Sequence, residues 1–339
     1  MRKIGLIING LLFLCFDLFG QSSLTKTGTT VANYLNIDVG SRAVAMGGSF
    51  VSIANDASAM YWNPAGIARI KDNSALFCHT KWIADIDINF VGVTVPIAGF
   101  GTIGAQAKFI IMDRMERTTV DFPDGNGEFF DAGSYVMGLS YARDLTDRFS
   151  IGGSFKYINE RIYNSSASAI AFDVGTLFTT QFNGLQLGMS ISNYGGKMRM
   201  DGKDLLIQTR IDDRYSGTSE NTNALLKTEA YDLPIMFRIG ISMDVLKGIG
   251  KSNLLLSMDA LHPNNSNESL NLGLEYVFNK MFALRAGYNS LFNEEINTGL
   301  SVGVGFHYAL IGTELQIDYG YQNFNELIEA QMFTLSIGF

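Results

Sequence analysis

The chain has 339 residues, of which 47% are hydrophobic, 12% aromatic and only 17% charged. Soluble domains carry about 25% charged residues and disordered chains have few aromatic residues, so the composition excludes disorder and is unusual for a soluble domain. The formal net charge is -8 and no basic stripe with interleaved aromatic residues occurs, so we expect no nucleic-acid partner. The two cysteines, Cys15 and Cys78, are too few for a disulfide scaffold. Three histidines are too few for a histidine-rich metal site, and we expect no metal and no cofactor.

Residues 1–20 have the pattern of a secretory signal peptide. Arg2 and Lys3 form a positive start, and an apolar core of about thirteen residues follows. A membrane anchor is the alternative, but spanning a bilayer takes about 20 apolar residues. Cys15 invites a lipoprotein interpretation, which we disfavour because Leu14 stands where a small residue is expected.

Residues 21–72 do not alternate like a strand and are rich in small side chains. Asp56 predicts the N-cap of a short helix that runs through Trp62, and Asn63 followed by Pro64 predicts the start of a second helical turn. Because small residues let backbones approach closely, this segment is expected to form a compact insert.

From residue 73 to 339 the chain repeats segments of about ten residues in which apolar and polar side chains alternate. Alternation with period two places one set of side chains on each face of a strand. About fourteen segments start near residues 74, 86, 101, 133, 148, 168, 184, 233, 252, 268, 281, 297, 312 and 331. An even number of segments, each near the roughly 9–11 residues that a tilted strand needs to cross a bilayer, predicts an all-β, transmembrane antiparallel β-barrel.

The connections between these segments alternate in length. The predicted short ones are 98–100, 143–147, 181–183 and 279–280, and the long polar ones are 113–132, 160–167, 196–231, 261–267 and 320–330. Outer-membrane barrels have short periplasmic turns and longer outer loops, so both chain termini are expected on the periplasmic side.

A barrel of this width leaves a lumen that wall side chains alone do not fill. Its interior is predicted to be polar, with these residues facing inward: Gln106, Lys108, Asp173, Arg238, Glu275, Arg285, Glu314 and Asp318. We therefore expect residues 21–72 to form a hatch inside the barrel, residues 73–339 to form the wall, and residues 1–20 to be the signal peptide. The alternative is a lead-in segment that packs outside the barrel.

Four runs in the N-terminal segment carry a resemblance to a known family: residues 40–43 (GSRA), 45–48 (AMGG), 56–59 (DASA) and 62–66 (WNPAG). At these residues the sequence resembles the hatch of the PorV/PorQ family of outer-membrane barrels, which are related to the FadL fatty-acid transporters. Residues 139–150 are also similar to that family. The hatch-motif residues under this resemblance are Arg42, Gly47, Gly48, Asp56, Asn63, Pro64 and Gly66.

The resemblance implies a FadL-like barrel of fourteen strands with an internal hatch, in the outer membrane of a Gram-negative bacterium and in contact with its lipid. The C-terminal Phe339, preceded by Phe333, Leu335 and Ile337, resembles a barrel-assembly signal and implies the barrel-assembly machinery as a partner.

An enzymatic activity is not expected. His307 is the only histidine well placed in the interior of a predicted strand, and no serine or aspartate at strand spacing makes a convincing partner for it. Catalysis requires a nucleophile and a base within hydrogen-bonding reach, whereas a lone histidine is more often part of a polar wall.

Two functional hypotheses follow, and a purely structural role in the outer membrane is a third. The resemblance favours first an accessory component of type IX protein secretion that binds the translocon or secreted cargo, with Phe122, Phe129 and Phe130 as candidate contacts in an outer loop. The alternative is a FadL-like channel for uptake or export of hydrophobic small molecules. Its candidate lining is formed by five hatch residues, for which ordinary packing against the wall is the simpler interpretation: Met46, Phe50, Met60, Tyr61 and Trp62.

Overall fold

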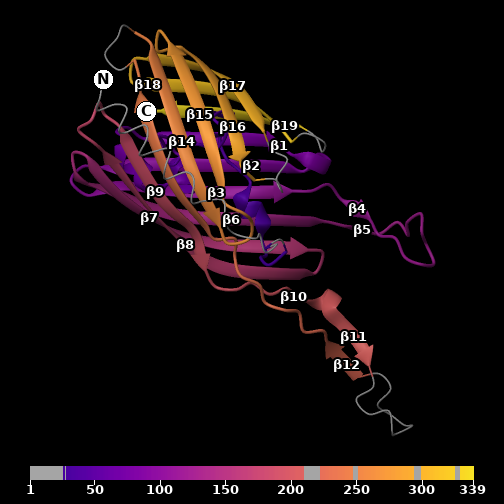
Figure 1. Ribbon diagram of the computed structural model, residues 1–339. Helices are drawn as coiled ribbons and strands as arrows, with labels where there is room; N and C mark the ends of the chain where they lie inside the picture. Colours follow the sequence, from indigo (N-terminus) through magenta and orange to yellow (C-terminus); the bar gives the residue numbers. More distant parts are fainter. Residues whose placement is uncertain (1–25, 27, 210–221, 247–250, 294–298, 325–328) are drawn as a thin grey trace.

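The computed structural model describes residues 26, 28–209, 222–246, 251–293, 299–324 and 329–339. The predicted signal peptide at residues 1–20, including Cys15, lies outside these residues. Figure 1 shows a barrel of long strands with two arms projecting from one end, while the C-terminus lies at the other end.

Fourteen antiparallel strands form the barrel wall, as the sequence predicts, and each predicted start falls within three residues of the observed one. The strands are β1 (Ser74–Lys81), β2 (Asp87–Ile97), β3 (Gly101–Ile111), β6 (Ala132–Thr146), β7 (Phe149–Ile162), β8 (Ser165–Thr179), β9 (Gln186–Gly195), β13 (Met236–Asp244), β14 (Asn253–Pro263), β15 (Ser269–Phe278), β16 (Phe282–Leu291), β17 (Leu300–Leu310), β18 (Thr313–Asn323) and β19 (Glu329–Gly338).

The sheet closes on itself, because every wall strand pairs with a neighbour on both sides. Most neighbours in the ring are also neighbours in sequence, and the first strand, β1, pairs with the last strand, β19, from Ser74 opposite Gly338 to Lys81 opposite Gln331. Closure pairs the backbone groups of both sheet edges, which a hydrocarbon environment requires.

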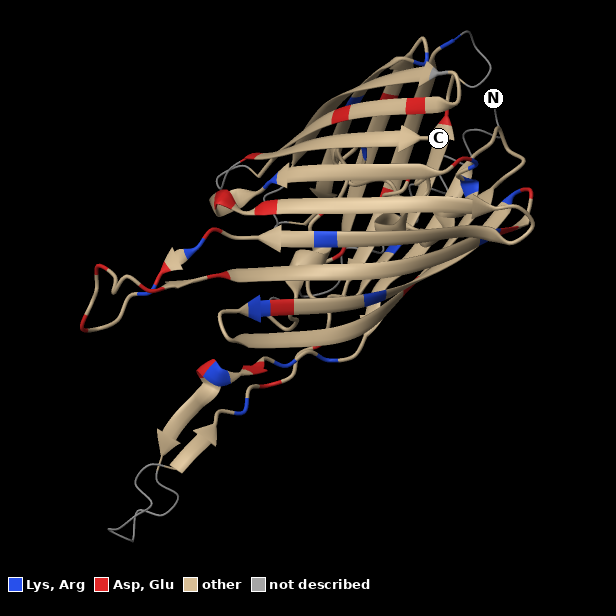
Figure 2. Cartoon of the chain, turned by 180° about the vertical axis from the view of Figure 1, so that it is seen from behind, with Lys and Arg blue, Asp and Glu red and all other residues tan. Residues whose placement is uncertain are grey.

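The outward face of the wall is apolar. Large side chains that point outward include Leu139 (63% exposed), Val174 (53%) and Val304 (52%), as expected for a face that contacts lipid. In Figure 2, long stretches of strand carry no charged residue, while many charged residues lie in the loops and arms. Among the helices within the described ranges, none combines the length and apolar character of a membrane-spanning helix.

The inward face is polar and buried. Seven of the eight residues predicted to face inward are at most 9% exposed, and Glu314, near the start of β18, is exposed instead. Alternation is therefore preserved along the strands, because one residue set contacts lipid and the other contacts the lumen.

Short turns lie at the end of the barrel that holds the C-terminus, and most longer connections lie at the opposite end. Several predicted boundaries were wrong, because strands extend into predicted connections; β14, for example, continues to Pro263 within the predicted connection 261–267. Residues 160–167 are almost entirely strand, with only Tyr163 and Asn164 between β7 and β8; residues 143–146 belong to β6; and β18 continues to Asn323. Polar residues near the ends of a strand gave no signal that distinguished them from a loop.

Two outer connections form projecting arms that the sequence did not predict (Figure 1). Between β3 and β6, β4 (Met115–Glu116) pairs with β5 (Phe129–Phe130). Between β9 and β13, β10 (Asp201–Gly202) pairs with β8, the turn η5 (Lys203–Leu205) follows, and β11 (Leu206–Thr209) pairs with β12 (Thr222–Leu225). The short outer connection between β1 and β2 contains the turn η4 (Ile83–Asp85).

The N-terminal segment lies inside the barrel, as predicted, and contains four short helical elements: η2 (Asn33–Asn36), α2 (Ser41–Ala45), α3 (Ala59–Trp62) and η3 (Pro64–Arg69). It begins at the end with the longer connections, which we call the outer end, where Thr30 bridges to Asp232 just before β13. It reaches the end with the short turns, where Arg69 contacts Ser150 at the start of β7. Phe339 lies at the end with the short turns, the end predicted to hold both termini. The N-terminal end of the predicted mature chain falls outside the described residues. We call residues 28–72 the hatch.

Helix α3 begins later than predicted. Its N-cap is Ser58 rather than Asp56, and Asp56 instead accepts a hydrogen bond from the backbone N–H of Ser58 (2.8 Å). This is an Asx turn, in which an aspartate side chain accepts from the backbone N–H two residues later. The predicted pair of Asn63 and Pro64 is confirmed: the Asn63 side chain accepts from Ala65 N (3.2 Å) and Pro64 occupies the first position of η3.

Candidate functional site

The candidate site is the contact between the hatch and the inner wall. Its closest approaches occur at wall glycines that face the lumen. A Cβ atom on Gly287 would lie 2.0 Å from the backbone N of Gly47, and one on Gly175 would lie 2.0 Å from the Asn63 side chain. Further wall glycines meet hatch atoms in the same way: Gly104, Gly152, Gly188, Gly240, Gly273 and Gly303. The hatch therefore fits only a wall that lacks side chains at these points.

Hatch residues are matched to this wall. Gly47 has φ +66°, a conformation that favours glycine, and a Cβ there would meet the backbone of Tyr288 at 2.7 Å. Gly66 lies so close to Ala54 that a Cβ would be 2.2 Å from its carbonyl oxygen. The glycines of the hatch motif are thus explained by close contact within the hatch and between the hatch and the wall.

One charged cluster joins the hatch to β15, β16 and β18. Arg42 Nε donates to Glu275 Oε2 (2.8 Å) and Arg42 Nη2 donates to Glu275 Oε1 (2.9 Å). Arg285 Nε also donates to Glu275 Oε2 (2.6 Å), and Arg285 Nη1 donates to Asp318 Oδ1 (2.7 Å). A two-point guanidinium–carboxylate contact fixes orientation as well as distance, so Arg42 holds α2 in one position against the wall.

Wall side chains also satisfy backbone groups of the hatch. Asp259 Oδ2 accepts from the N–H groups of Phe50 and Val51 (2.7 and 2.8 Å). Lys108 Nζ donates to the carbonyl oxygens of Tyr34 and Ile37 (2.8 and 2.6 Å). Since an irregular segment has few backbone partners of its own, inward polar residues replace the water that a loop would normally bind.

Asn63 performs the same task from the hatch side. Its Nδ2 donates to the carbonyl oxygen of Val51 (2.8 Å) in the hatch and to that of Thr176 (3.0 Å) in β8. Together with its cap on Ala65, these contacts give one residue three structural roles.

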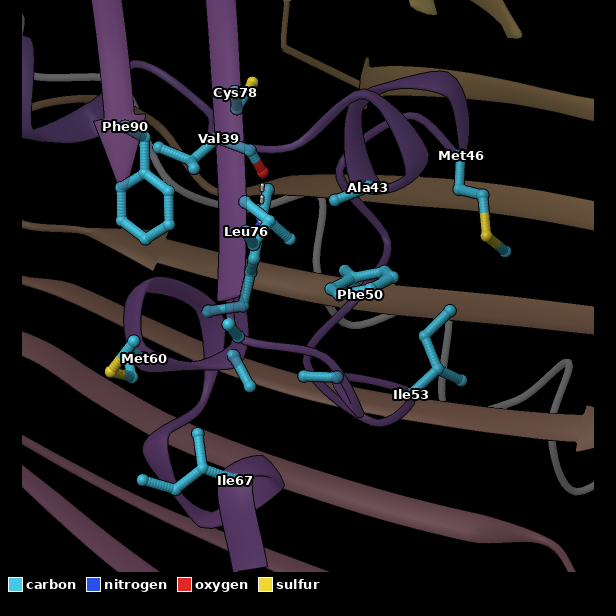
Figure 3. Close-up of a cluster of buried hydrophobic side chains, with 14 of the residues drawn as sticks. Val39, Ala43, Met46, Phe50, Ile53, Met60, Ile67, Leu76, Cys78 and Phe90 are labelled. Atoms are coloured by element: carbon cyan, nitrogen blue, oxygen red, sulfur yellow. Dashed lines mark hydrogen bonds between the residues drawn. The ribbon is translucent and has the colours of Figure 1, made fainter. Parts of the chain in front are cut away.

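The apolar side chains of the hatch form a packed cluster with β1 and β2 (Figure 3). Met46, Phe50 and Met60 are 0% exposed and Trp62 is 1% exposed; Trp62 Nε1 donates to Val39 O (2.9 Å). Tyr61 is partly buried and its ring meets that of Trp62 at 5.1 Å. The five residues predicted to line a ligand path therefore pack with one another and with the wall.

Other predicted residues fall at separate places. His307 lies in β17 with Nε2 4.0 Å from Asp318 Oδ1, beside the charged cluster. Phe122 and Phe129 are 57% and 56% exposed on the first arm, whereas the ring of Phe130 contacts that of Tyr163. On this arm Arg117 Nη1 donates to Glu128 (2.6 Å), and this hydrogen bond lowers the pKa of the Glu128 carboxyl.

The four C-terminal residues that resemble an assembly signal share the outward face of β19 and the residue after it. Phe333 and Phe339 are 45% and 58% exposed, and Leu335 and Ile337 are half-buried.

Sequence reasoning did not identify the wall glycines as hatch contacts one by one, nor Asp259 as a hatch anchor. A signal for the first was present, because these glycines recur among the inward positions of many strands. For Asp259 no signal existed, since its partners Phe50 and Val51 are about two hundred residues away in sequence.

Residues 20–153 match the sequence profile of a family described as Uncharacterised protein family (UPF0164). The match covers the hatch and the first strands of the wall. No curated protein sequence matches the chain.

Solved structures with a similar fold are outer-membrane-type barrels. The toluene transporter TbuX of Ralstonia pickettii is 11% identical over 88% of this chain and 97% of its own, with a TM-score of 0.54. A FadL homologue of Pseudomonas aeruginosa is 14% identical over 92% and 99%, with a TM-score of 0.52. The toluene transporter TodX of Pseudomonas putida is 12% identical over 88% and 96%, with a TM-score of 0.54. At these identities the likeness establishes the fold: a FadL-like, closed barrel of fourteen strands.

Proposed function

We propose that this chain is a PorV/PorQ-type barrel of the Gram-negative outer membrane that binds protein partners at its outer end, as an accessory component of type IX protein secretion. The observation that carries this proposal is the pair of projecting arms with exposed apolar side chains. On the first arm these include Val120 (99% exposed), Phe122 and Phe129; on the second, Leu206 (51%) and Leu225 (52%).

These side chains are beyond the apolar band of the wall, so lipid does not cover them. Aromatic anchors surrounded by polar residues are typical of protein interfaces. The hatch supports the same role, because its ion pairs and close backbone contacts make the barrel a filled support for the arms. Secreted cargo or the translocon is the proposed partner.

The test replaces the two exposed aromatic residues of the first arm in the full chain, as Phe122→Ser with Phe129→Ser. We expect several-fold less secreted cargo at the cell surface, with the amount of folded barrel unchanged. Phe182→Ser is the matched control, because Phe182 is 75% exposed at the opposite, periplasmic end. Normal cargo secretion in a strain that lacks the whole protein would refute the proposal.

A FadL-like channel for hydrophobic small molecules is the second candidate, favoured by the likeness in fold to proteins described as toluene transporters. Met46, Phe50, Met60, Tyr61 and Trp62 would line its path only after the hatch shifts, since four of them are fully packed. Uptake of labelled fatty acid or toluene into vesicles containing the protein tests this candidate. Uptake no faster than in protein-free vesicles would exclude it.

A further inference from the structure

A cavity of about 270 Å³ lies between the hatch and the outer loops, away from the packed apolar cluster. Its hatch side is formed by residues of the segment 33–38, and its outer side by the loop between β14 and β15. Trp82 and Phe324, from two other outer connections, complete the lining. The volume is just below the range of about 300–1,000 Å³ found for small-molecule pockets, so it suits a small ligand.

The lining of this cavity combines apolar side chains with many side-chain amides and hydroxyls. Six of the amides are Asn33, Asn36, Asn265, Asn267, Asn271 and Gln322. Each amide carries both donors and acceptors, and a sugar hydroxyl likewise both donates and accepts. A pocket for a hydrocarbon has few polar groups, whereas this lining sets many amides beside its apolar surface, as an amphipathic ligand requires.

Two aromatic side chains, Trp82 and Phe324, line the cavity beside the amides. The rings of Trp82 and Phe324 meet edge to face, with centroids 4.9 Å apart and an angle of 80° between their planes. An aromatic side chain next to hydrogen-bonding groups combines an apolar surface with polar contacts. This combination complements a sugar ring, which has apolar C–H groups on its faces and hydroxyls around its edge.

The charges of the lining cancel. Among the described residues that form it, Asp38 and Arg238 are the charged ones, and their charges are opposite. A ligand with a net charge would gain from one of these groups and be repelled by the other. The balance favours an uncharged ligand.

Two buried polar atoms of lining residues have no hydrogen-bond partner within the described part of the chain: Asn36 Oδ1 and Arg238 Nε. Arg238 is 3% exposed. Leaving such a group unpaired is unfavourable, so unpaired buried groups are uncommon in stable structures. Both atoms are closed off from the cavity itself, so a ligand reaches them only when their side chains move.

We propose that this outer cavity binds one ring of a neutral saccharide, either free or at the end of a longer glycan. The side-chain amides contact its hydroxyls, and the Trp82 side chain contacts a face of the ring. The inference is independent of the proposed secretion role, because it concerns a different surface and is measured without cargo.

The test uses the mature, full-length protein in detergent and calorimetric titration with glucose, galactose, mannose and N-acetylglucosamine. At least one of these sugars is expected to bind saturably, and about tenfold more tightly than glucuronate, which carries a charge. Disaccharides ending in the bound sugar distinguish the two sources: binding as tight as or tighter than the monosaccharide indicates a glycan end, and much weaker binding indicates a free sugar.

Two variants place the binding in this cavity. Asn267→Ala and Trp82→Ala are each expected to weaken binding about tenfold, whereas Gln208→Ala, on the second arm, leaves it unchanged. Asn267 lies in a loop and is half-buried, so Asn267→Ala decides the question if Trp82→Ala does not fold. Absence of saturable binding to all four sugars, equal or tighter binding of glucuronate, or binding that survives Asn267→Ala would overturn the proposal.

Discussion

Arg42 and Glu275 are separated by 233 positions in sequence and form a two-point ion pair inside the barrel, at 2.8 and 2.9 Å. The pair joins α2 of the hatch to β15 of the wall. Arg42 also donates to Asn55 (2.6 Å) and lies over the ring of Phe50 at 5.3 Å. A single side chain therefore connects the Asn55 side chain of the hatch, the hatch core and the wall.

Replacing this side chain should loosen the hatch. Removing one member of a buried ion pair costs about 3–5 kcal/mol; because Arg285 still contacts Glu275, we expect Arg42→Ala to cost about 3 kcal/mol, at the lower end. Arg42→Lys keeps the charge but loses the two-point contact, and should be intermediate. Urea unfolding in detergent and protease cleavage of the hatch measure both effects. Arg143→Ala, at an exposed position of β6, is the control, and equal stability of all three variants would contradict this role.

The wall glycines predict a steric effect. In Gly287→Ala the added Cβ would lie 2.0 Å from Gly47 N, so the hatch or the wall must shift, and overpacking of this kind costs about 1–3 kcal/mol. Gly196→Ala is the matched control, because a Cβ there has no neighbour within 4 Å. The two variants are compared by heat-modified gel mobility, with a lower fraction of folded barrel expected for Gly287→Ala alone. Equal folded fractions would show that the contact is not needed.

Asn63 allows its roles to be separated. Asn63→Ala removes the cap on Ala65 and both donors to Val51 and Thr176, and should cost roughly 2–3 kcal/mol from one cap and two hydrogen bonds. Asn63→Ser retains a capping oxygen and should recover about 1 kcal/mol of that loss. Chemical denaturation of the three proteins provides the comparison. If serine is no better than alanine, the cap on η3 contributes nothing measurable.

The C-terminal residue is predicted to matter during assembly rather than in the folded barrel. Phe339 is 58% exposed at the end of the chain, so Phe339→Ala removes little buried surface and should hardly change stability after refolding. In cells we expect several-fold less assembled protein in the outer membrane. Phe178→Ala, which truncates an outward aromatic residue of β8 with 41% exposure, serves as the control and should assemble normally.

The wall could be predicted from the sequence because each strand carries its own information. Alternation along segments such as 185–192 separates the lipid face from the lumen face, and nothing remote is needed to interpret it. The hatch could be placed in the lumen because its small residues and the width of the barrel pointed to the same arrangement. The partners of Arg42 and Asp259 could not be predicted, since they depend on which strands meet the hatch in space.

Local irregularities in the wall also could not be predicted from the sequence. Asn193 has φ +63° and sits in a bulge of β9 opposite Asp173, whose carboxylate accepts its N–H (2.7 Å). Ser290 has φ +58° in a similar bulge of β16, where Asn271 Oδ1 accepts its N–H (2.8 Å). In both cases a side chain on the adjacent strand completes the bulge, and a period-two pattern cannot reveal an extra residue across a strand pair.

The position of the hatch in the chain has a consequence for biogenesis. The hatch is followed directly by β1, and β1 meets β19 where the ring closes. The glycine-lined wall accepts the hatch backbone at contact distance, leaving no room to thread it through a finished cylinder. We therefore expect the hatch to take its place before β1 and β19 pair, so that closure of the ring holds it inside.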